Sequence, residues 1–402
     1  MSNTPQIRFA GFTDAWEQRK LGEVANNFEY GLNASAKEFD GKNKYIRITD
    51  IDDESRMFLS DDITSPDTDL TLSDKYKLET GDILFARTGA SVGKTYLYRE
   101  KDGLVYYAGF LIRAKINSEN DAEFVFQNTL TDSYNSFIRI TSQRSGQPGV
   151  NAQEYQDFTF FVPSLREQKG IGDFFRNLDN LITLHQRKCD ALQKFKKSML
   201  QKMFPKNGSL YPEIRFAGFT DAWEQREFGE VGSVSMCKRI FKDETVDDGE
   251  IPFYKIGTFG SEPDAYISRE LYEEYRSKYS YPHKGDILLS ASGTIGRIVE
   301  YNGEEAYFQD SNIVWLSHDE TISNLFLKTL YPIVKWNGIE GSTIKRLYND
   351  NFLKTKFMMP SLSEQTQIGT FFSTLDHLIT LHQRKLETLK KLKKSMLQKM
   401  FV

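Results

Sequence analysis

A short glycine-containing loop after a predicted strand carries the residue types that hold phosphates. The segment Gly89-Ala-Ser-Val-Gly93-Lys94-Thr95 resembles a nucleotide-binding phosphate loop, but three residues separate its glycines where that loop needs four. A matching segment, Gly293 to Ile298, lacks the Lys followed by a hydroxyl residue. We therefore predict no nucleotide site. Instead we expect polar side chains of these loops to face another ligand.

A second polar loop follows each of these segments, at Gln143–Asn151 and at Gly338–Arg346. Arg pairs with guanine, Asn and Gln pair with adenine, and Ser and Thr contact bases or phosphates. The alternative is an ordinary polar loop. The candidate DNA-contacting residues are Arg87, Thr88, Ser91, Lys94, Gln143, Arg144, Gln147 and Asn151, then Ser290, Ser292, Thr294, Arg297, Ser342, Thr343, Lys345 and Arg346.

Catalytic and metal-binding patterns are missing from the sequence. The five histidines have no ligand spacing, and neither Cys189 nor Cys237 lies in a metal motif. No Gly-X-Ser-X-Gly nucleophile turn occurs. We therefore expect a non-enzymatic chain without a metal or cofactor of its own. Lacking an export signal or a membrane-length apolar run, it is expected in the cytoplasm.

The elements that must position these loops come in two copies. Three segments recur without a change: 7–19 at 214–226, 181–188 at 378–385, and 196–204 at 393–401. The sequences between them differ. An identical frame around different contents indicates one assembly surface used twice, with two different recognition surfaces.

Each copy ends in a predicted long helix. Ser164 with Glu167, and Ser361 with Glu364, predict capping boxes. Apolar residues then recur every three or four positions over about 40 residues, a rod of about 60 Å. The helices are expected to pair antiparallel, although each could pack only on its own domain. The seam comprises Ile171, Phe175, Leu178, Ile182, His185, Leu192, Met199, Ile368, Phe372, Leu375, Ile379, His382, Leu386, Leu389 and Met396.

Charge is unevenly spread along the chain. The net charge is −4, but both helix ends, 185–206 and 382–399, are strongly basic, whereas acidic residues gather elsewhere, as in 50–69. Local patches rather than the total decide phosphate binding. A solvated helix face explains such lysines equally well.

The predicted fold class is α+β, with two strand-rich target-recognition domains joined by two long antiparallel coiled-coil helices in a pseudo-two-fold arrangement. The glycine-led strands at 81–86 and 285–290 mark equivalent points of the two domains. We expect a first recognition domain at 1–162, a spacer helix at 163–204 and a linker at 205–213. The second recognition domain and spacer helix follow at 214–359 and 360–402.

These motifs together resemble the DNA-specificity subunit of bacterial type I restriction–modification systems. The resemblance rests on the segment 7–19, the Gly-Asp-Ile-Leu strand, Gly341 to Tyr348, and the Pro-Ser-Leu-X-Glu-Gln helix start, and it covers both halves. The first half departs from it, with 146–151 in place of the Gly-Ser-Thr-Ile-Lys loop.

The resemblance implies a non-catalytic subunit in which each half recognises one part of a bipartite, asymmetric site on double-stranded DNA. It implies two modification (methyltransferase) subunits and restriction (endonuclease and translocase) subunits as partners. Adenine methylation would use S-adenosylmethionine on the modification subunit, and restriction would use ATP and Mg²⁺ on the restriction subunit. No membrane partner is implied.

Overall fold

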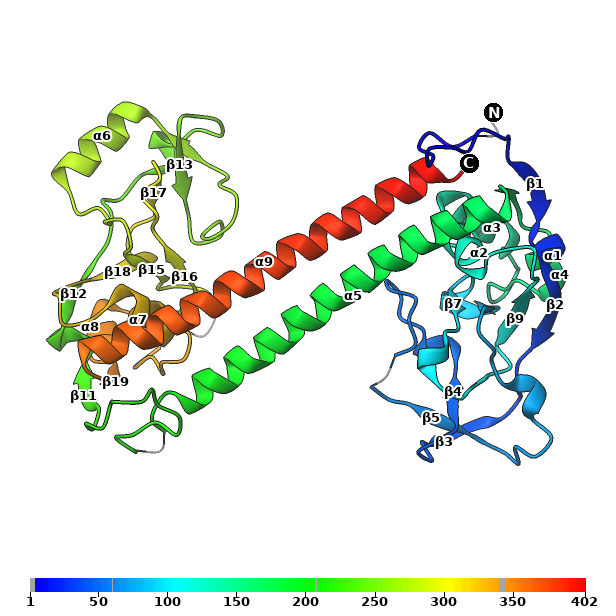
Figure 1. Cartoon of the computed structure of the whole chain (residues 1–402). Helices are drawn as coiled ribbons and strands as arrows, with labels where there is room; N and C mark the ends of the chain where they lie inside the picture. Colours follow the sequence, from blue (N-terminus) through cyan, green and yellow to red (C-terminus); the bar gives the residue numbers. More distant parts are fainter. Residues whose placement is uncertain (1–3, 60, 207, 340, 342–344) are drawn as a thin grey trace. The chain divides into compact units, whose positions relative to one another are not determined.

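The computed structural model describes residues 4–59, 61–206, 208–339, 341 and 345–402. The chain divides into two compact units (Figure 1), the first formed by 1–187 with 382–402 and the second by 188–381. Ser342 and Thr343, two candidate DNA-contacting residues, lie outside the described residues. Because of this division, each unit contains the start of one long helix and the end of the other.

The first unit contains three small sheets. A four-stranded antiparallel sheet has the order β2-β9-β6-β7, formed by Ala25–Tyr30, Leu111–Ile116, Asp82–Ala86 and Thr95–Leu97. A second has the order β3-β5-β4-β8, formed by Ser35–Glu38, Thr64–Asp67, Lys44–Ile46 and Val105–Tyr107. Strand β1 (Glu17–Lys20) pairs with β10 (Thr159–Val162). The short helices are α1 (Leu21–Val24), α2 (Ala122–Asn128), α3 (Asp132–Thr141) and α4 (Ala152–Gln156).

The second unit repeats this plan, with three strands instead of four in its second sheet. Its four-stranded sheet has the order β12-β18-β15-β16, formed by Gly232–Ser235, Ile313–His318, Ile287–Ser290 and Ile298–Glu300. A three-stranded sheet has the order β14-β13-β17, formed by Tyr266–Ile267, Ile251–Tyr254 and Tyr307–Phe308. Strand β11 (Glu224–Glu227) pairs with β19 (Lys356–Met359), and the short helices are α6 (Arg269–Lys278), α7 (Asn324–Leu330) and α8 (Asn349–Leu353).

Two long helices supply the rest of each unit. Helix α5 spans Leu165–Lys202 and α9 spans Leu362–Met400, with 38 and 39 residues. In the first unit Asp179 of α5 pairs with Lys393 of α9 at 2.7 Å, and His185 Nδ1 lies 2.8 Å from His382 Nδ1. In the second unit Lys196 pairs with Asp376 at 2.5 Å. The helices therefore run antiparallel within each unit, as predicted.

The predicted seam is buried or half-buried along its length. Ile171, Phe175 and Leu178 are at most 5% exposed, and Ile368, Phe372 and Leu375 at most 6%. All of these except Leu178 also belong to the hydrophobic cores of the two units. Both of the packing modes considered from the sequence are therefore present, because the helix starts pack on a domain as well as on the other helix.

The identical frame segments are explained by an identical set of contacts. Arg8 donates two hydrogen bonds to Glu167, at 2.7 and 2.8 Å, and Arg215 does the same to Glu364 at the same distances. Both carboxylates are 1% exposed. These bonds raise the pKa of the Arg8 and Arg215 guanidinium groups.

The helix starts differ in one respect from the predicted capping boxes. Ser361 Oγ does accept a long hydrogen bond, 3.4 Å, from the backbone N–H of Glu364. The carboxylates of Glu167 and Glu364, however, bind the arginines of the frame segments. The prediction failed because the Ser-X-X-Glu pattern fits a local cap, whereas the arginine that binds the carboxylate lies far away in the sequence.

The residues directly after each long helix close the core of a unit. In the first unit Phe401 lies 6.5 Å from Trp16 and 5.4 Å from Phe124, centroid to centroid. In the second, Phe204 lies 5.7 Å from Trp223 and 5.8 Å from Phe326. The recurring tail therefore recurs because it fills the same aromatic pocket twice.

Candidate nucleic-acid interface

The two polar loops singled out in the first half lie side by side. The backbone N–H of Gly89 donates to Pro148 O at 3.0 Å, and Val150 N–H donates to Arg87 O at 2.9 Å. Thr88 and Gly149 form an isolated β-bridge between them. Two loops about 60 residues apart in the sequence thus form one surface at the end of β6.

The second unit pairs its loops in the same way. Gly293 N–H donates to Lys345 O at 2.9 Å, and Leu347 N–H donates to Ala291 O at 2.8 Å. Ser292 and Arg346 form the isolated bridge. The matching bonds make Arg87 equivalent to Ala291 and Pro148 equivalent to Lys345. The backbone hydrogen bonds of the two units therefore match, while the side chains at these positions differ.

A third loop, which was not selected from the sequence, joins each pair. In the first unit Arg87 N–H donates to Phe110 O at 3.1 Å, and in the second Ala291 N–H donates to Asn312 O at 2.8 Å. Phe110 lies in the turn between β8 and β9, and Asn312 in the turn between β17 and β18. Turn residues give no periodic signal, so only the tertiary structure places them here.

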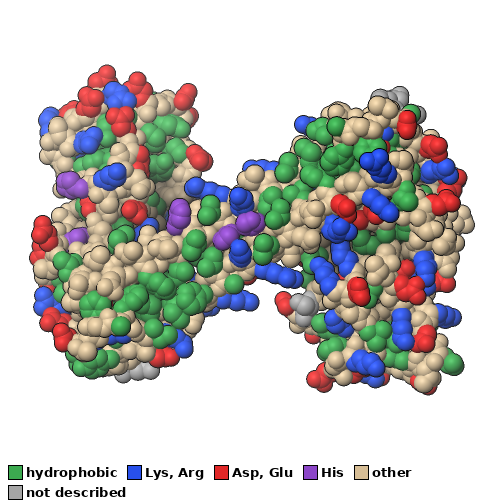
Figure 2. Space-filling view, in the orientation of Figure 1, with side chains coloured by type: hydrophobic (Ala, Val, Ile, Leu, Met, Phe, Trp, Pro, Cys, Tyr) green, Lys and Arg blue, Asp and Glu red, His purple; other side chains and the backbone are tan. Residues whose placement is uncertain are grey.

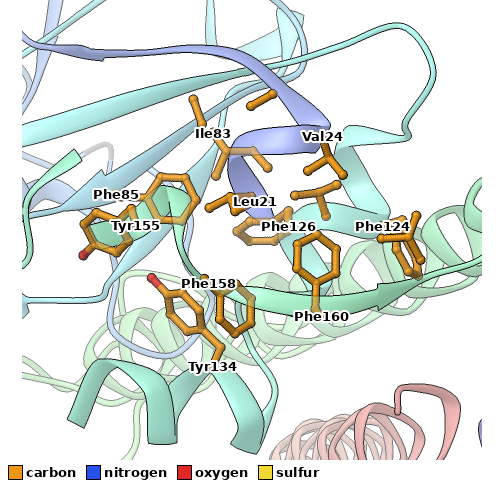
Figure 3. Packing of buried hydrophobic residues seen from close by; sticks show 14 of the residues in the cluster. Leu21, Val24, Ile83, Phe85, Phe124, Phe126, Tyr134, Tyr155, Phe158 and Phe160 are labelled. Atoms are coloured by element: carbon orange, nitrogen blue, oxygen red, sulfur yellow. The ribbon is translucent and has the colours of Figure 1, made fainter. Parts of the chain in front are cut away.

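Two buried tyrosines fix the base of the first loop. Tyr155 Oη donates to Ala86 O at 2.6 Å, and Tyr134 Oη donates to Gly93 O at 3.0 Å. Both rings lie in the core of the first unit (Figure 3), and burial raises the pKa of both hydroxyls. Gly93 has a φ of 82°, and a Cβ there would lie 2.6 Å from Ile138 Cγ2. Buried side chains therefore fix the two ends of the 87–93 loop on the core side.

Several candidate side chains of the first unit are available to a ligand. The Arg87 guanidinium lies 4.9 Å from the ring centroid of Tyr30, which is 43% exposed. Gln143 and Gln147 are exposed, Thr88 and Ser91 are half-buried, and Asn151 is exposed while its side-chain oxygen caps α4. Exposed Arg144 binds Glu154. Tyr30 was not among the predicted residues.

Lys94 and Ser290 have structural partners instead. Lys94 is 8% exposed, and its Nζ lies 2.6 Å from Asp53 and donates to Ile51 O at 3.0 Å. Ser290 is 0% exposed, and its Oγ donates to Thr294 O at 2.5 Å and accepts from Arg297 N–H at 3.0 Å. The phosphate-loop-like Lys is therefore directed into the domain and not toward its surface.

The paired loops of the second unit border a cavity of about 480 Å³. Ser292, Asn312, Arg346 and Asn349 contribute polar groups to its wall. Thr294, Lys345 and Arg346 are exposed. Arg297 is exposed too, and its guanidinium donates to Ile256 O at 2.8 Å. Of these exposed residues only Arg346 lines the cavity, and the acidic Asp350 also lies in its wall.

A larger cleft of about 860 Å³ lies in the first unit, between its recognition domain and the helix pair. Basic side chains gather in its lining, namely Arg56, Arg99, Lys101, Arg187, Lys390, Lys391, Lys393 and Lys394. Some already have acidic partners, since Lys390 lies 2.7 Å from Glu54. Figure 2 shows blue and red side chains interspersed on the visible face of this unit. The lysines of the α9 tail therefore face a cleft.

Comparison with known proteins identifies the family. The model of the type I restriction modification DNA specificity domain matches residues 13–194 and again residues 220–391. The chain belongs to this family. Specificity subunits recognise DNA sequence within a type I restriction–modification complex and are not themselves enzymes, which confirms the resemblance and the predicted function.

Individual relatives agree with this assignment. A putative type I restriction enzyme specificity subunit from Haemophilus influenzae, S.HindORF215P, is 60% identical over 158 residues, covering 38% of this chain and 41% of the relative. The putative MjaX specificity subunit of Methanocaldococcus jannaschii is 23% identical over 98% of this chain and 95% of the relative. The S subunit from M. genitalium has the same fold, with a TM-score of 0.67 at 13% identity over 99% of both chains.

Within the described residues, no group of three or more His, Cys, Asp or Glu side chains is arranged to hold a metal ion. No helix among them is long and apolar enough to cross a membrane.

Proposed function

We propose that the three-loop surface of each unit reads one part of a bipartite, asymmetric DNA site, and that the chain thereby directs adenine methylation or restriction by partner subunits. The observation that carries this proposal is the matched set of backbone bonds around Arg87 and Ala291. A shared frame with different side chains is what two readers of different sequences require.

The contacts proposed for each reader follow from exposure and hydrogen bonding. In the first unit they are Arg87, Thr88, Ser91, Gln143, Arg144, Gln147 and Asn151, and in the second Ser292, Thr294, Arg297, Lys345 and Arg346. Ser342 and Thr343 remain predictions from the sequence. Lys94 and Ser290 are left out because they are buried and their polar groups bind other parts of the protein. Ser292 is only 6% exposed, but it is retained because it lines the cavity.

Domain exchange tests the division of labour. Residues 22–160 would be replaced by the equivalent region of another specificity subunit, and methylation would be mapped in cells that also express the modification subunit. Only one half-site should change. Alteration of both halves would show that the units do not read independently. A chain that binds protein alone would give no sequence-specific gel shift in the presence of its methyltransferase partner.

The first-unit cleft is proposed to contact the phosphate backbone. Lys391 and Lys394 line it and are directed toward open space rather than the core. Each phosphate contact contributes about −0.9 to the slope of log K against log salt concentration. Replacing both lysines by Ala should therefore make that slope less negative by up to about 2, without changing the recognised sequence. An unchanged slope would remove the cleft from the interface.

We further propose that two modification subunits dock on the repeated frame, with restriction subunits joining the complex. Each unit places apolar side chains at equivalent, exposed or half-buried positions, namely Phe9, Phe174 and Leu392 in the first and Phe216, Phe371 and Phe195 in the second. Leu392 is 40% exposed and Phe195 45%. Repeated apolar surface on a frame that does not read DNA indicates a repeated protein partner.

Mass measurement of the assembled complex tests this stoichiometry. The intact chain should bind two modification subunits, and Leu392→Asp or Phe195→Asp should each remove one. Loss of both partners from either variant would contradict separate, equivalent docking sites. S-adenosylmethionine is proposed to bind the modification subunits, and ATP and Mg²⁺ the restriction subunits.

A further inference from the structure

The turn that carries Phe110 forms the third loop of the first reading surface. Leu111 N–H donates to Ala108 O at 2.8 Å and closes the turn, and Gly109 N–H donates to Leu32 O at 2.9 Å. The bond from Arg87 N–H to Phe110 O ties the turn to the paired loops. The backbone of Phe110 is therefore fixed on three sides.

The Phe110 side chain, by contrast, is 59% exposed. A single exposed apolar residue is ordinary on a protein surface. This one differs because the backbone bond from Arg87 holds it in the three-loop surface, where the candidate side chains Arg87, Thr88 and Gln147 carry hydrogen-bonding groups. An apolar ring held among hydrogen-bonding groups can distinguish apolar from polar parts of a ligand.

The equivalent position in the second unit carries an amide. Asn312 accepts the matching bond from Ala291 N–H, and it lines the 480 Å³ cavity together with Ser292 and Arg346. Its turn has one more residue, since Ile313 N–H donates to Gln309 O. The frame thus presents an aromatic ring in one reader and an amide in the other, at the same place.

Resting on the proposed function, we propose that Phe110 and Asn312 are specificity-determining residues, with Phe110 contacting the methyl group of a thymine in the first half-site and Asn312 pairing with an adenine in the second. In the major groove only thymine presents a methyl group, which Phe can contact. An Asn amide matches the N6 donor and N7 acceptor of adenine.

The test uses the complete chain assembled with its modification subunit. Methylation mapping first defines both half-sites, and DNA duplexes then carry deoxyuridine in place of each thymine of the first half-site in turn. Deoxyuridine lacks only the methyl group. One such substitution should weaken binding by the intact complex about tenfold, and should change binding by the Phe110→Ala complex less than about twofold. For Asn312, 7-deazaadenine replaces each adenine of the second half-site in turn and removes its N7 acceptor. One such replacement should weaken binding by the intact complex and hardly change binding by the Asn312→Ala complex.

The control and the contrary results are defined by the same measurements. Leu72→Ala, which removes a side chain that is 90% exposed elsewhere in the first unit, should keep the full deoxyuridine effect. The unaltered second half-site reports that the Phe110→Ala complex is folded and assembled. Insensitivity of the intact complex to every deoxyuridine, or equal sensitivity of Phe110→Ala, overturns the assignment while the proposed function stands. Absence of sequence-specific methylation by the intact chain overturns both.

Discussion

Removal of the Arg8 side chain tests whether the frame segment acts through its buried ion pair. Arg8→Ala deletes two charge-assisted hydrogen bonds, at 2.7 and 2.8 Å, and leaves the Glu167 carboxylate behind. That carboxylate is 1% exposed, and the Arg8 side chain 14%. The substitution therefore creates a nearly buried negative charge without its partner.

The expected cost follows from this geometry. Breaking a buried ion pair by removing one partner costs about 3–5 kcal/mol, and the partial exposure of Arg8 places the value near the lower end, at about 3 kcal/mol. For a unit of about 200 residues, each kcal/mol lowers Tm by about 2–4 °C. The transition of the first unit should therefore fall by about 6–12 °C.

Scanning calorimetry of the whole chain measures this shift. Arg19→Ala is the matched control, because Arg19 and Glu17 form an exposed pair, with side chains 49% and 69% exposed. Exposed pairs contribute about 0–1 kcal/mol, so Tm should hardly move. Arg8→Ala combined with Glu167→Gln should be more stable than Arg8→Ala alone, because the unpaired charge is gone.

The reasoning is refuted if Arg8→Ala and Arg19→Ala have the same Tm, or if Glu167→Gln gives no recovery in the Arg8→Ala background. Arg215→Ala provides an internal repeat of the experiment. Its bonds to Glu364 have the same lengths, and Glu364 is also 1% exposed. A shift of similar size should appear in the transition of the second unit.

Three further outcomes are expected. Four residues inserted at equivalent points of both long helices add about 6 Å to each, so methylation mapping should show a gap between half-sites longer by one or two base pairs; altered half-site sequences would contradict a spacer role. Lys94→Met should lower stability by about 1–3 kcal/mol because it leaves the buried Ile51 carbonyl without its donor, and neither the intact chain nor the variant should hydrolyse ATP; ATP hydrolysis by the intact chain that the variant lacks would indicate a nucleotide site at Lys94. Burial raises the pKa of the Cys237 thiol to about 12, so at pH 8 only about one thiol in 10⁴ is ionised, and iodoacetamide should modify Cys237 in urea but hardly in the folded chain; equal rates would show that the thiol is accessible.

Much of the fold could be predicted because its signals are local and periodic. The 3–4 spacing from Ile171 to Met199 predicted α5, and the antiparallel partner followed from the second copy of the same seam. The capping-box prediction used an equally local pattern and failed at Glu167. The Glu167 carboxylate binds Arg8, which is about 160 residues away in the sequence. Local rules do not include such distant partners.

The candidate site was predicted in part. The sequence indicated both polar loops of each half by their residue types, but it could not show that Gly89 and Pro148 are hydrogen-bonded neighbours. It suggested that Lys94 faces a ligand, whereas the fold buries it against Asp53. Residue type reports what a side chain can bind, while the direction of that side chain depends on packing.

The sequence by itself determined that one frame is used twice around two different sets of recognition residues, because identity and difference are visible without coordinates. Only the tertiary structure decided which turns meet at each reading surface. It thereby showed that Phe110 of the first unit and Asn312 of the second occupy equivalent positions. The physical reason is that backbone hydrogen bonds between distant loops depend on three-dimensional proximity, which leaves no periodic trace in the chain.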